Sequence, residues 1–156
     1  MSKKEIMKPY YITGFVDGEG SFSVSFNYRE KFKNKVEVRP SFSISQHKRN
    51  KEVLYQIKDY FGVGGVRFSK RDQNYKYEVR SIDDLSRVII PYFIKYPLLT
   101  SKRNDFEKFT LICELIYTNH HLDSKYLRHI IDIAYQMNKS GKRKFSKSKL
   151  LKFLTR

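Results

Sequence analysis

The chain has 156 residues, which is enough to bury a hydrophobic core without disulfides, and a single domain spanning residues 1–156 is the expected organisation. Its one cysteine excludes a disulfide framework and a cysteine-based metal site, no apolar run is long enough to span a membrane, and the first residues carry no secretion signal. The formal net charge of +16 is too large to serve solubility alone, and it predicts a polyanionic partner, nucleic acid before a membrane surface.

The first elements are a helix and two strands. A helix is predicted to begin at Pro9, a favoured first-turn residue, and Gly20 is expected to follow its last turn as a C′ residue. The apolar period then changes to two along residues 21–29 and 36–45, which predicts two strands joined by a basic turn at residues 30–35. Each strand has one apolar and one polar face.

The middle of the chain repeats this order. Asn50 is expected to cap a second helix that ends at Gly62. Two short strands follow at residues 66–69 and 75–80, and residues 71–74 form the hairpin turn between them.

Helices fill the rest of the chain. Ser81 and Asp84 form a capping box for a helix that Pro91 is expected to interrupt. Two more helices are predicted at about residues 101–117 and 124–137, the second ended by Gly141. The core therefore covers about residues 6–138, and a basic C-terminal extension, residues 139–156, is interpreted as a segment that contacts a nucleic-acid backbone.

This order predicts an α+β fold, with one four-stranded antiparallel sheet and helices on a single face. The other face carries small hydrogen-bonding residues mixed with Arg and Lys, which are the side chains that read base edges in the major groove. The alternative is that this face is simply solvated. The candidate DNA-contact residues are Ser21, Ser23, Ser25, Asn27, Arg29, Lys31, Lys33, Lys35, Glu37, Arg39, Ser41, Ser43, Ser45, His47, Lys48, Arg49, Arg67, Ser69, Lys70, Arg71, Lys76, Glu78 and Arg80.

The segment ITGFVDGEG, residues 12–20, is the most informative part of the sequence. Gly14 and Gly18 lie one helical turn apart on one face, where the missing Cβ atoms let a second backbone come close. If the partner is a copy of the same helix, two Glu19 carboxylates converge, and a divalent cation with phosphate would relieve their repulsion. Tyr11, Gly14, Phe15 and Gly18 are the candidate dimer-interface residues.

The segment ITGFVDGEG closely resembles the LAGLIDADG motif, with Ile12, Gly14, Val16, Asp17 and Gly20 at the expected places. The stretches GVGGVRF and YPLLTSKRNDF extend the likeness to nearly the whole chain up to about Tyr117. The chain thus resembles a single-motif LAGLIDADG homing endonuclease. The resemblance implies an αββαββα fold, a saddle-shaped sheet facing DNA, and a homodimer joined through the motif helices.

The resemblance also implies the roles of individual residues. Glu19 takes the place of the catalytic acid, whose carboxylate binds Mg²⁺ together with scissile phosphate oxygens, and the carbonyl of Gly18 is an extra candidate ligand. Gln46 matches a residue that positions solvent near the metal, and Lys102 matches a lysine of the metal shell. Lys102 also stands at a helix start, where a cation is disfavoured by the helix dipole, which argues for a specific role.

The sequence departs from the family pattern at one position. Asn50 stands where a second basic residue is expected, so Arg49 or Lys48 is the candidate substitute. Asp17 is interpreted as structural, through capping or pairing near the helix end. The histidines at positions 120, 121 and 129 are interpreted as surface or packing residues, and Cys113 as a buried apolar residue.

Three functions remain open from the sequence. The first is a site-specific, Mg²⁺-dependent endonuclease that cuts double-stranded DNA as a homodimer, on a pseudo-palindromic target of roughly 18 base pairs, and spreads its own intron. The second is a maturase that binds intron RNA, and the third is a DNA-binding regulator without nuclease activity. The composition points to an AT-rich coding sequence and hence to an organelle (mitochondrion or chloroplast) or a bacterial cytoplasm.

Overall fold

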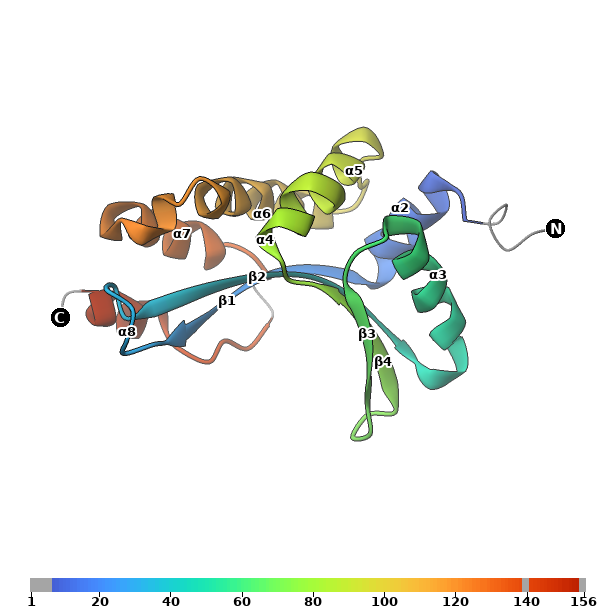
Figure 1. Ribbon diagram of the computed structural model, residues 1–156, viewed down its shortest axis with the longest axis horizontal. Helices are drawn as coiled ribbons and strands as arrows, with labels where there is room; N and C mark the ends of the chain where they lie inside the picture. Colours follow the sequence, from blue (N-terminus) through green and yellow to red (C-terminus); the bar gives the residue numbers. More distant parts are fainter. Residues whose placement is uncertain (1–6, 139–140, 155–156) are drawn as a thin grey trace.

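The computed structural model describes residues 7–138 and 141–154 and confirms the α+β fold class, with one four-stranded antiparallel sheet. Its strands lie in the order β1-β2-β4-β3 (Figure 1). In chain order, the elements are α2 (Pro9–Glu19), β1 (Gly20–Tyr28), β2 (Val36–His47), η1 (Lys48–Asn50), α3 (Lys51–Phe61), β3 (Gly65–Ser69), β4 (Asn74–Val79), α4 (Ile82–Asp84), η2 (Leu85–Ile89), α5 (Ile90–Lys95), α6 (Lys102–Tyr117), η3 (His120–Leu122), α7 (Ser124–Ala134) and α8 (Lys147–Leu154).

The strand register divides the sheet into an apolar and a polar face. Phe42 of β2 is paired with Phe22 on one side and with Val79 on the other, and all three side chains are buried. Because side chains alternate along a strand, the neighbouring residues Ser43 and Glu78 fall on the opposite face. Figure 1 shows α4, α5, α6 and α7 on one side of β1 and β2, and the other side of these strands is free of long helices.

Gly20 leads the chain from α2 directly into β1. Its φ of −85° and ψ of 168° are extended, so it is not the left-handed C′ residue that the sequence suggested. A glycine is needed here because a Cβ atom would lie 2.7 Å from Val16 Cγ1 and 3.0 Å from Val16 O. The tight junction keeps the last turn of α2 next to the sheet.

Pro91 does not end the helical path, but the α-helical pattern is interrupted next to it. The chain stays helical through α4, η2 and α5, and η2 is a π-helical turn that ends at Ile89, just before the first turn of α5, in which Pro91 lies. At the end of η2, the backbone N–H of Ile90 donates to the carbonyl oxygen of Leu85. The wider π turn accommodates the residue that lacks an N–H, so the helix continues.

Two other boundaries differ from those predicted. The β3–β4 turn covers residues 70–73, because Asn74 already pairs with Ser69. Helix α7 ends at Ala134, before the predicted end at Met137, and so Gly141 does not end it. The last turn tightens instead: the Ala134 carbonyl oxygen accepts from the backbone N–H of Met137 at 3.1 Å and also from Arg143 Nη2 at 2.5 Å.

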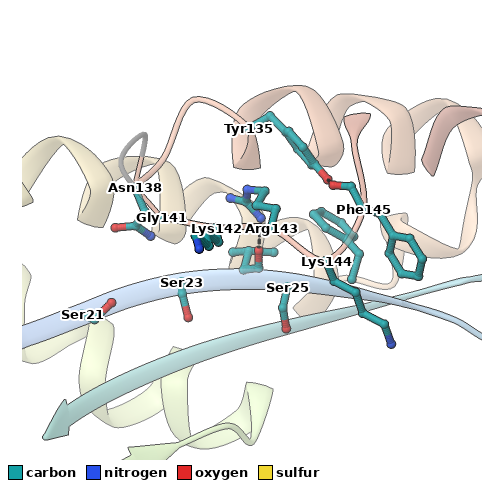
Figure 2. Close-up of a pocket in the computed structure, with 12 residues that line it drawn as sticks. Ser21, Ser23, Ser25, Tyr135, Asn138, Gly141, Lys142, Arg143, Lys144 and Phe145 are labelled. Atoms are coloured by element: carbon teal, nitrogen blue, oxygen red, sulfur yellow. Dashed lines mark hydrogen bonds between the residues drawn. The ribbon is translucent and has the colours of Figure 1, made fainter. Parts of the chain in front are cut away.

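The C-terminal segment runs along the outer edge of β1 (Figure 2). Asn138 Nδ2 donates to the carbonyl oxygen of Phe22 at 2.7 Å, and Arg143 Nη1 donates to that of Val24 at 2.7 Å. The Arg143 guanidinium also lies 4.5 Å from the centroid of the Tyr135 ring. These contacts satisfy backbone groups that an edge strand would otherwise leave unpaired.

Candidate active site and nucleic-acid interface

The structure brings Glu19, Gln46 and Lys102 together at the C-terminal end of α2. Glu19 is the last residue of this helix and its side chain is exposed. Gln46 lies near the end of β2, on the same face as Phe42 and Ile44, and its Nε2 donates to Glu19 Oε2 at 3.2 Å. Residues far apart in the chain therefore form one polar cluster, as the likeness to the motif implied.

Lys102 is the first residue of α6, but its ammonium group lies at the end of another helix. Lys102 Nζ donates to the carbonyl oxygens of Val16 at 2.8 Å and Asp17 at 3.0 Å. The Val16 carbonyl oxygen also accepts from the backbone N–H of Gly20, and both carbonyls lie at the negative end of the helix dipole, which stabilises this cation.

The ionisation of Lys102 reflects its surroundings. Burial lowers the pKa of Lys102 from its usual value, while the nearby carboxylates of Asp17, Glu19 and Asp105 act in the opposite direction. The lysine is thus a partly desolvated cation within reach of the Glu19 carboxylate, and its field acts on any group that approaches the end of α2.

Asp17 fastens the loop before α6 to the motif helix. Its carboxylate accepts from the backbone N–H of Leu99 at 2.8 Å, and from the N–H and the hydroxyl of Thr100 at 3.3 and 2.7 Å. Partial burial opposes ionisation, but these hydrogen bonds outweigh it, so the pKa of Asp17 is lowered from its usual value. The contacts agree with the structural interpretation of Asp17, since they hold Lys102 in its place under α2.

The two candidate substitutes for the missing basic residue point to different places. Lys48 Nζ donates to Gln73 Oε1 at 3.1 Å, which directs this side chain to the β3–β4 turn. Arg49 lines a groove of about 470 Å³ beside α2 together with Gln46 and Asn50. Of the two, only Arg49 shares a groove with the polar cluster.

The cluster holds too few acidic groups for a metal site made by one chain alone. Among residues 7–138 and 141–154, no group of three or more His, Cys, Asp and Glu side chains is placed to hold a metal ion. Glu19 is an exposed oxygen donor, and the carbonyl of Gly18 lies in the last helical turn, where an intrahelical donor is lacking. These hard oxygen donors suit a divalent cation such as Mg²⁺ or Ca²⁺ if other ligands come from outside the chain.

The glycine face of α2 is open. A Cβ atom added at Gly14 or Gly18 would meet no atom within 4 Å, so the fold of the described chain does not require glycine at either position. Tyr11 and Phe15 flank this face, with ring centroids 6.2 Å apart, and Tyr11 is 48% exposed. Each glycine lowers the stability of a helix by about 1 kcal/mol relative to alanine. No contact within the described part of the protomer requires that loss of stability at Gly14 or Gly18.

The polar face of the sheet is organised around two carboxylates. Glu37 pairs with Arg29 at 2.8 Å and Arg39 at 4.0 Å. Glu78 is surrounded by three cations, Arg67 and Lys76 at 3.4 Å and Arg80 at 3.9 Å. The acids thus order basic side chains that would otherwise repel one another, which explains why acidic residues stand on a basic face.

Two predicted contact residues on this face are covered. Ser41 and Ser43 are only 9% and 8% exposed, in contrast to the open positions expected from the alternation. They lie on the central strand β2, flanked by β1 and β4, and Ser41 Oγ donates to Glu78 Oε2 at 2.7 Å. Ser41 therefore supports Glu78 from within the sheet.

The remaining predicted contact residues differ in exposure. Arg29, Lys31, Lys33, Ser25, Ser45, Lys48, Arg49, Arg67, Ser69, Lys70, Arg71 and Arg80 are exposed, and Ser21, Ser23, Asn27, Lys35, Glu37, Arg39, His47, Lys76 and Glu78 are partly buried. His47 Nδ1 accepts from the backbone N–H of Arg49 at 3.3 Å, and Lys35 Nζ donates to the Glu30 carbonyl oxygen at 2.7 Å.

The structure shows where the basic C-terminal segment lies, which the sequence did not indicate. Ser21, Ser23 and Ser25 line a groove of about 430 Å³ together with residues 141–145 (Figure 2). Lys144 Nζ reaches Asn27 Oδ1 at 3.5 Å. The run KRK at residues 142–144 was the available sequence signal, but nothing in it indicated which strand it would follow.

A search for membrane-spanning helices among the described residues finds none of sufficient length and hydrophobicity.

Comparison with known proteins identifies relatives for this arrangement. The family model described as LAGLIDADG endonuclease matches residues 12–113. Homing endonuclease I-ApeII from Aeropyrum pernix is 32% identical over 154 residues, covering 92% of this chain and 88% of that protein. The uncharacterized 50.9 kDa protein in ND4 intron 1 of Podospora anserina is 38% identical over 118 residues, but this chain spans only 26% of its length.

Two solved structures resemble the fold closely. The crystal structure of the homing endonuclease I-TnaI superposes with a TM-score of 0.83 and 36% identity, over 96% of this chain and 97% of that one. I-SmaMI bound to an uncleaved DNA target in the presence of calcium ions gives a TM-score of 0.84 and 32% identity, over 88% of this chain and 47% of that one. The present chain thus corresponds to a whole chain of the first protein and to about half of the second.

Proposed function

Because this chain belongs to the LAGLIDADG endonuclease family, we propose that it cuts double-stranded DNA at a specific site by hydrolysing one phosphodiester bond in each strand. The proposal rests on one observation: the side chains of Glu19, Gln46 and Lys102 lie together at the exposed end of the motif helix α2. A carboxylate, an amide and a desolvated cation are the groups needed to bind, orient and neutralise a reacting phosphate.

The polar face of the sheet is the proposed DNA surface. The exposed cations of the β1–β2 turn, of η1 and of the β3–β4 hairpin provide phosphate contacts, which position the duplex, while Ser, Asn, Arg and Lys side chains on the strands contact base edges. A formal charge of +16 on 156 residues supports a strongly salt-dependent association. I-SmaMI, a structural relative, is bound to a DNA target in its crystal structure, which supports the same partner here.

A homodimer completes the proposed active site. The open glycine face of α2 lets a second copy of the helix approach, and this brings a second Glu19 towards the first. Two Glu19 carboxylates from two chains would supply acidic ligands that the described residues of one chain do not gather at one place. The match of this chain to about half of I-SmaMI supports a role as one of two similar units, on a pseudo-palindromic target of roughly 18 base pairs.

Mg²⁺ is the proposed cofactor, with Glu19 and the carbonyl of Gly18 as its protein ligands. A bound divalent cation lowers the pKa of coordinated water and neutralises charge on the phosphate. Gln46 donates a hydrogen bond to Glu19 and so holds the carboxylate in place. Lys102, held under the helix end by two carbonyls, adds positive charge where the leaving oxygen develops negative charge.

Cleavage of a duplex library with Mg²⁺, followed by sequencing of the cut ends, tests this function. We expect cuts at one sequence, and their loss in Glu19→Gln with DNA affinity retained. Glu114→Gln is the matched control, because Glu114 is an exposed acid in the last turn of α6. Uncut DNA with the unchanged chain, or full cleavage by Glu19→Gln, would contradict the proposal.

The alternative is an RNA maturase that assists splicing of a group I intron on the same scaffold. The basic polar face also suits intron RNA, and the Podospora relative is named for the intron in which it lies. Glu19→Gln separates the two functions, because a maturase would still promote splicing. A DNA-binding regulator without nuclease activity is disfavoured by the intact cluster at Glu19. The amino-acid composition, which is typical of an AT-rich coding sequence, supports an organelle or a bacterial cytoplasm as the place of action.

A further inference from the structure

Asn50 occupies a helix-capping position but uses its side chain for something else. It is the N-cap residue of α3, yet its side chain makes no capping hydrogen bond to that helix. Its Nδ2 instead donates to Gln46 Oε1 at 3.4 Å. An asparagine at an N-cap normally accepts from the first turn of its own helix, so this departure indicates a different use of the side chain.

The contact matters because the Gln46 amide has two unlike ends. Its Nε2 end donates to Glu19 Oε2 at 3.2 Å, and its Oε1 end accepts from Asn50. An ionised carboxylate only accepts hydrogen bonds, so Glu19 is satisfied by one orientation of the amide alone. The opposite orientation would turn the Gln46 carbonyl oxygen towards the carboxylate, and the two would repel.

We propose that Asn50 is a positioning residue that fixes the orientation of the Gln46 amide and thereby the placement of the Glu19 carboxylate. The proposal rests on the function proposed above. Asn50 anchors Oε1, Nε2 then faces Glu19, and the second N–H of Gln46 stays free to donate to a water molecule or a phosphate oxygen. The donor comes from a neutral amide at the position where the family places a basic residue, so orientation is achieved without added charge.

The surroundings allow this role to be tested without disturbing the fold. Asn50 is exposed, and with Gln46 it lines the groove beside α2 that Tyr11 and Phe15 close on the other side. Since Asn50 does not cap α3 with its side chain, its replacement removes no helix-capping bond.

Three substitutions at this position should differ in their effect on cleavage. Asn50→Ala removes the donor, Asn50→Asp replaces it by an acceptor of nearly the same shape, and Asn50→Lys replaces the amide donor by an ammonium donor. In single-turnover cleavage at saturating DNA and Mg²⁺, we expect Asn50→Ala to be roughly three- to tenfold slower, the range of one hydrogen bond. Asn50→Asp should be slower still and Asn50→Lys close to the unchanged chain, while the DNA affinity of Asn50→Ala stays the same.

A double substitution shows whether Asn50 acts through Gln46. In a Gln46→Ala background there is no amide to orient, so adding Asn50→Ala should slow cleavage no further. An equal slowing in both backgrounds, or faster cleavage by Asn50→Asp than by Asn50→Ala, would overturn the proposal.

A measurement without DNA or metal separates this inference from the proposed function. In the free protein, one side-chain amide proton of Gln46 should resonate downfield in the NMR spectrum, because it is bonded to Glu19. We expect Asn50→Ala to reduce this shift and Asn50→Lys to preserve it, whereas the carboxylate of Asn50→Asp would itself accept from Gln46 Nε2 and keep an amide proton downfield. An unchanged shift in Asn50→Ala refutes the role of Asn50 even if the chain cuts DNA, whereas the expected shifts without any cleavage would leave the orientation established and refute the nuclease.

Discussion

The ammonium group of Lys102 donates a 2.8 Å hydrogen bond to the carbonyl oxygen of Val16, which lies 86 residues earlier in the chain. The contact joins the first residue of α6 to the last turn of α2, whose terminal carbonyls attract cations. It explains why a lysine stands at a helix start, where its own helix dipole disfavours it. The ammonium group of Lys102 is stabilised by the negative end of the α2 dipole, beside Glu19, and not by its own helix.

Lys102→Met should therefore slow cleavage without abolishing DNA binding. We expect the single-turnover rate constant to fall by roughly a hundredfold or more, the effect of removing one preorganised charge from a reacting phosphate. Arg103→Ala is the matched control, since Arg103 is the next residue, is exposed and pairs with Glu107 at 3.5 Å on the surface of α6. A rate for Lys102→Met equal to that of the control would exclude a role in the reaction.

Asp17→Asn should loosen the attachment of residues 99–100 to α2. The three hydrogen bonds that the carboxylate accepts would weaken with its charge, and we expect the free energy of unfolding to fall by about 1 kcal/mol after allowance for solvent screening. Urea denaturation of the metal-free protein measures this change. Asp59→Asn, at an exposed position of α3, should leave the stability as it is.

His121 should make the stability depend on pH. Burial lowers its pKa below the usual 6.5, and its Nδ1 makes no hydrogen bond with any residue that the structure describes. The unfolded chain binds the proton more readily, so the contribution of the neutral ring is fully present above pH 6.5 and is lost as the pH falls through the lower folded pKa. Urea denaturation near neutral pH and at about pH 5 should show a larger loss for the unchanged chain than for His121→Gln. Parallel losses would contradict this expectation.

Gly14→Ala should have opposite effects on the protomer and on the dimer. The new Cβ meets no atom within 4 Å, so the helix itself should gain about 1 kcal/mol in stability, while close approach of a second α2 is blocked. Analytical ultracentrifugation measures the association, and thermal unfolding measures the protomer. Gly65→Ala is the matched control, because its Cβ also meets nothing within 4 Å but lies on β3. If the dimerisation of Gly14→Ala equals that of the unchanged chain, the glycine face of α2 is not the dimer interface.

The basic C-terminal segment should contribute to the salt dependence of DNA binding. Replacing Lys142 and Lys144 with alanine should reduce the slope of log affinity against log salt by about 0.9 for each phosphate that is no longer neutralised, similarly for all DNA sequences. The Arg143 hydrogen bond to β1 should keep the segment in place. Lys125→Ala, at an exposed position of α7, is expected to leave the slope unchanged. An unaltered slope in the double variant would place the segment outside the DNA surface.

Local pattern was sufficient to predict most of the fold. The alternation of Phe22, Val24 and Phe26 with serines indicates a strand with one buried face, and the observed burial follows it. The form of the interruption at Pro91 was not predictable, because a π turn has no simple sequence signal. At the end of α7, the Ala134 carbonyl oxygen accepts from Arg143, nine residues later, and no periodic pattern in the sequence indicates this contact.

The residues of the site were likewise identifiable one by one, through their likeness to a known motif. Their contacts were not. That Gln46 donates to Glu19, that Asp17 holds residues 99–100 and that Lys102 binds the end of a helix other than its own all depend on how α2, β2 and α6 converge. Sequence spacing determines which face of an element a side chain occupies, because helices and strands have fixed periods. Which donor meets which acceptor is decided only when elements far apart in the chain pack together, and here that packing places a carboxylate, an amide and a cation at one helix end.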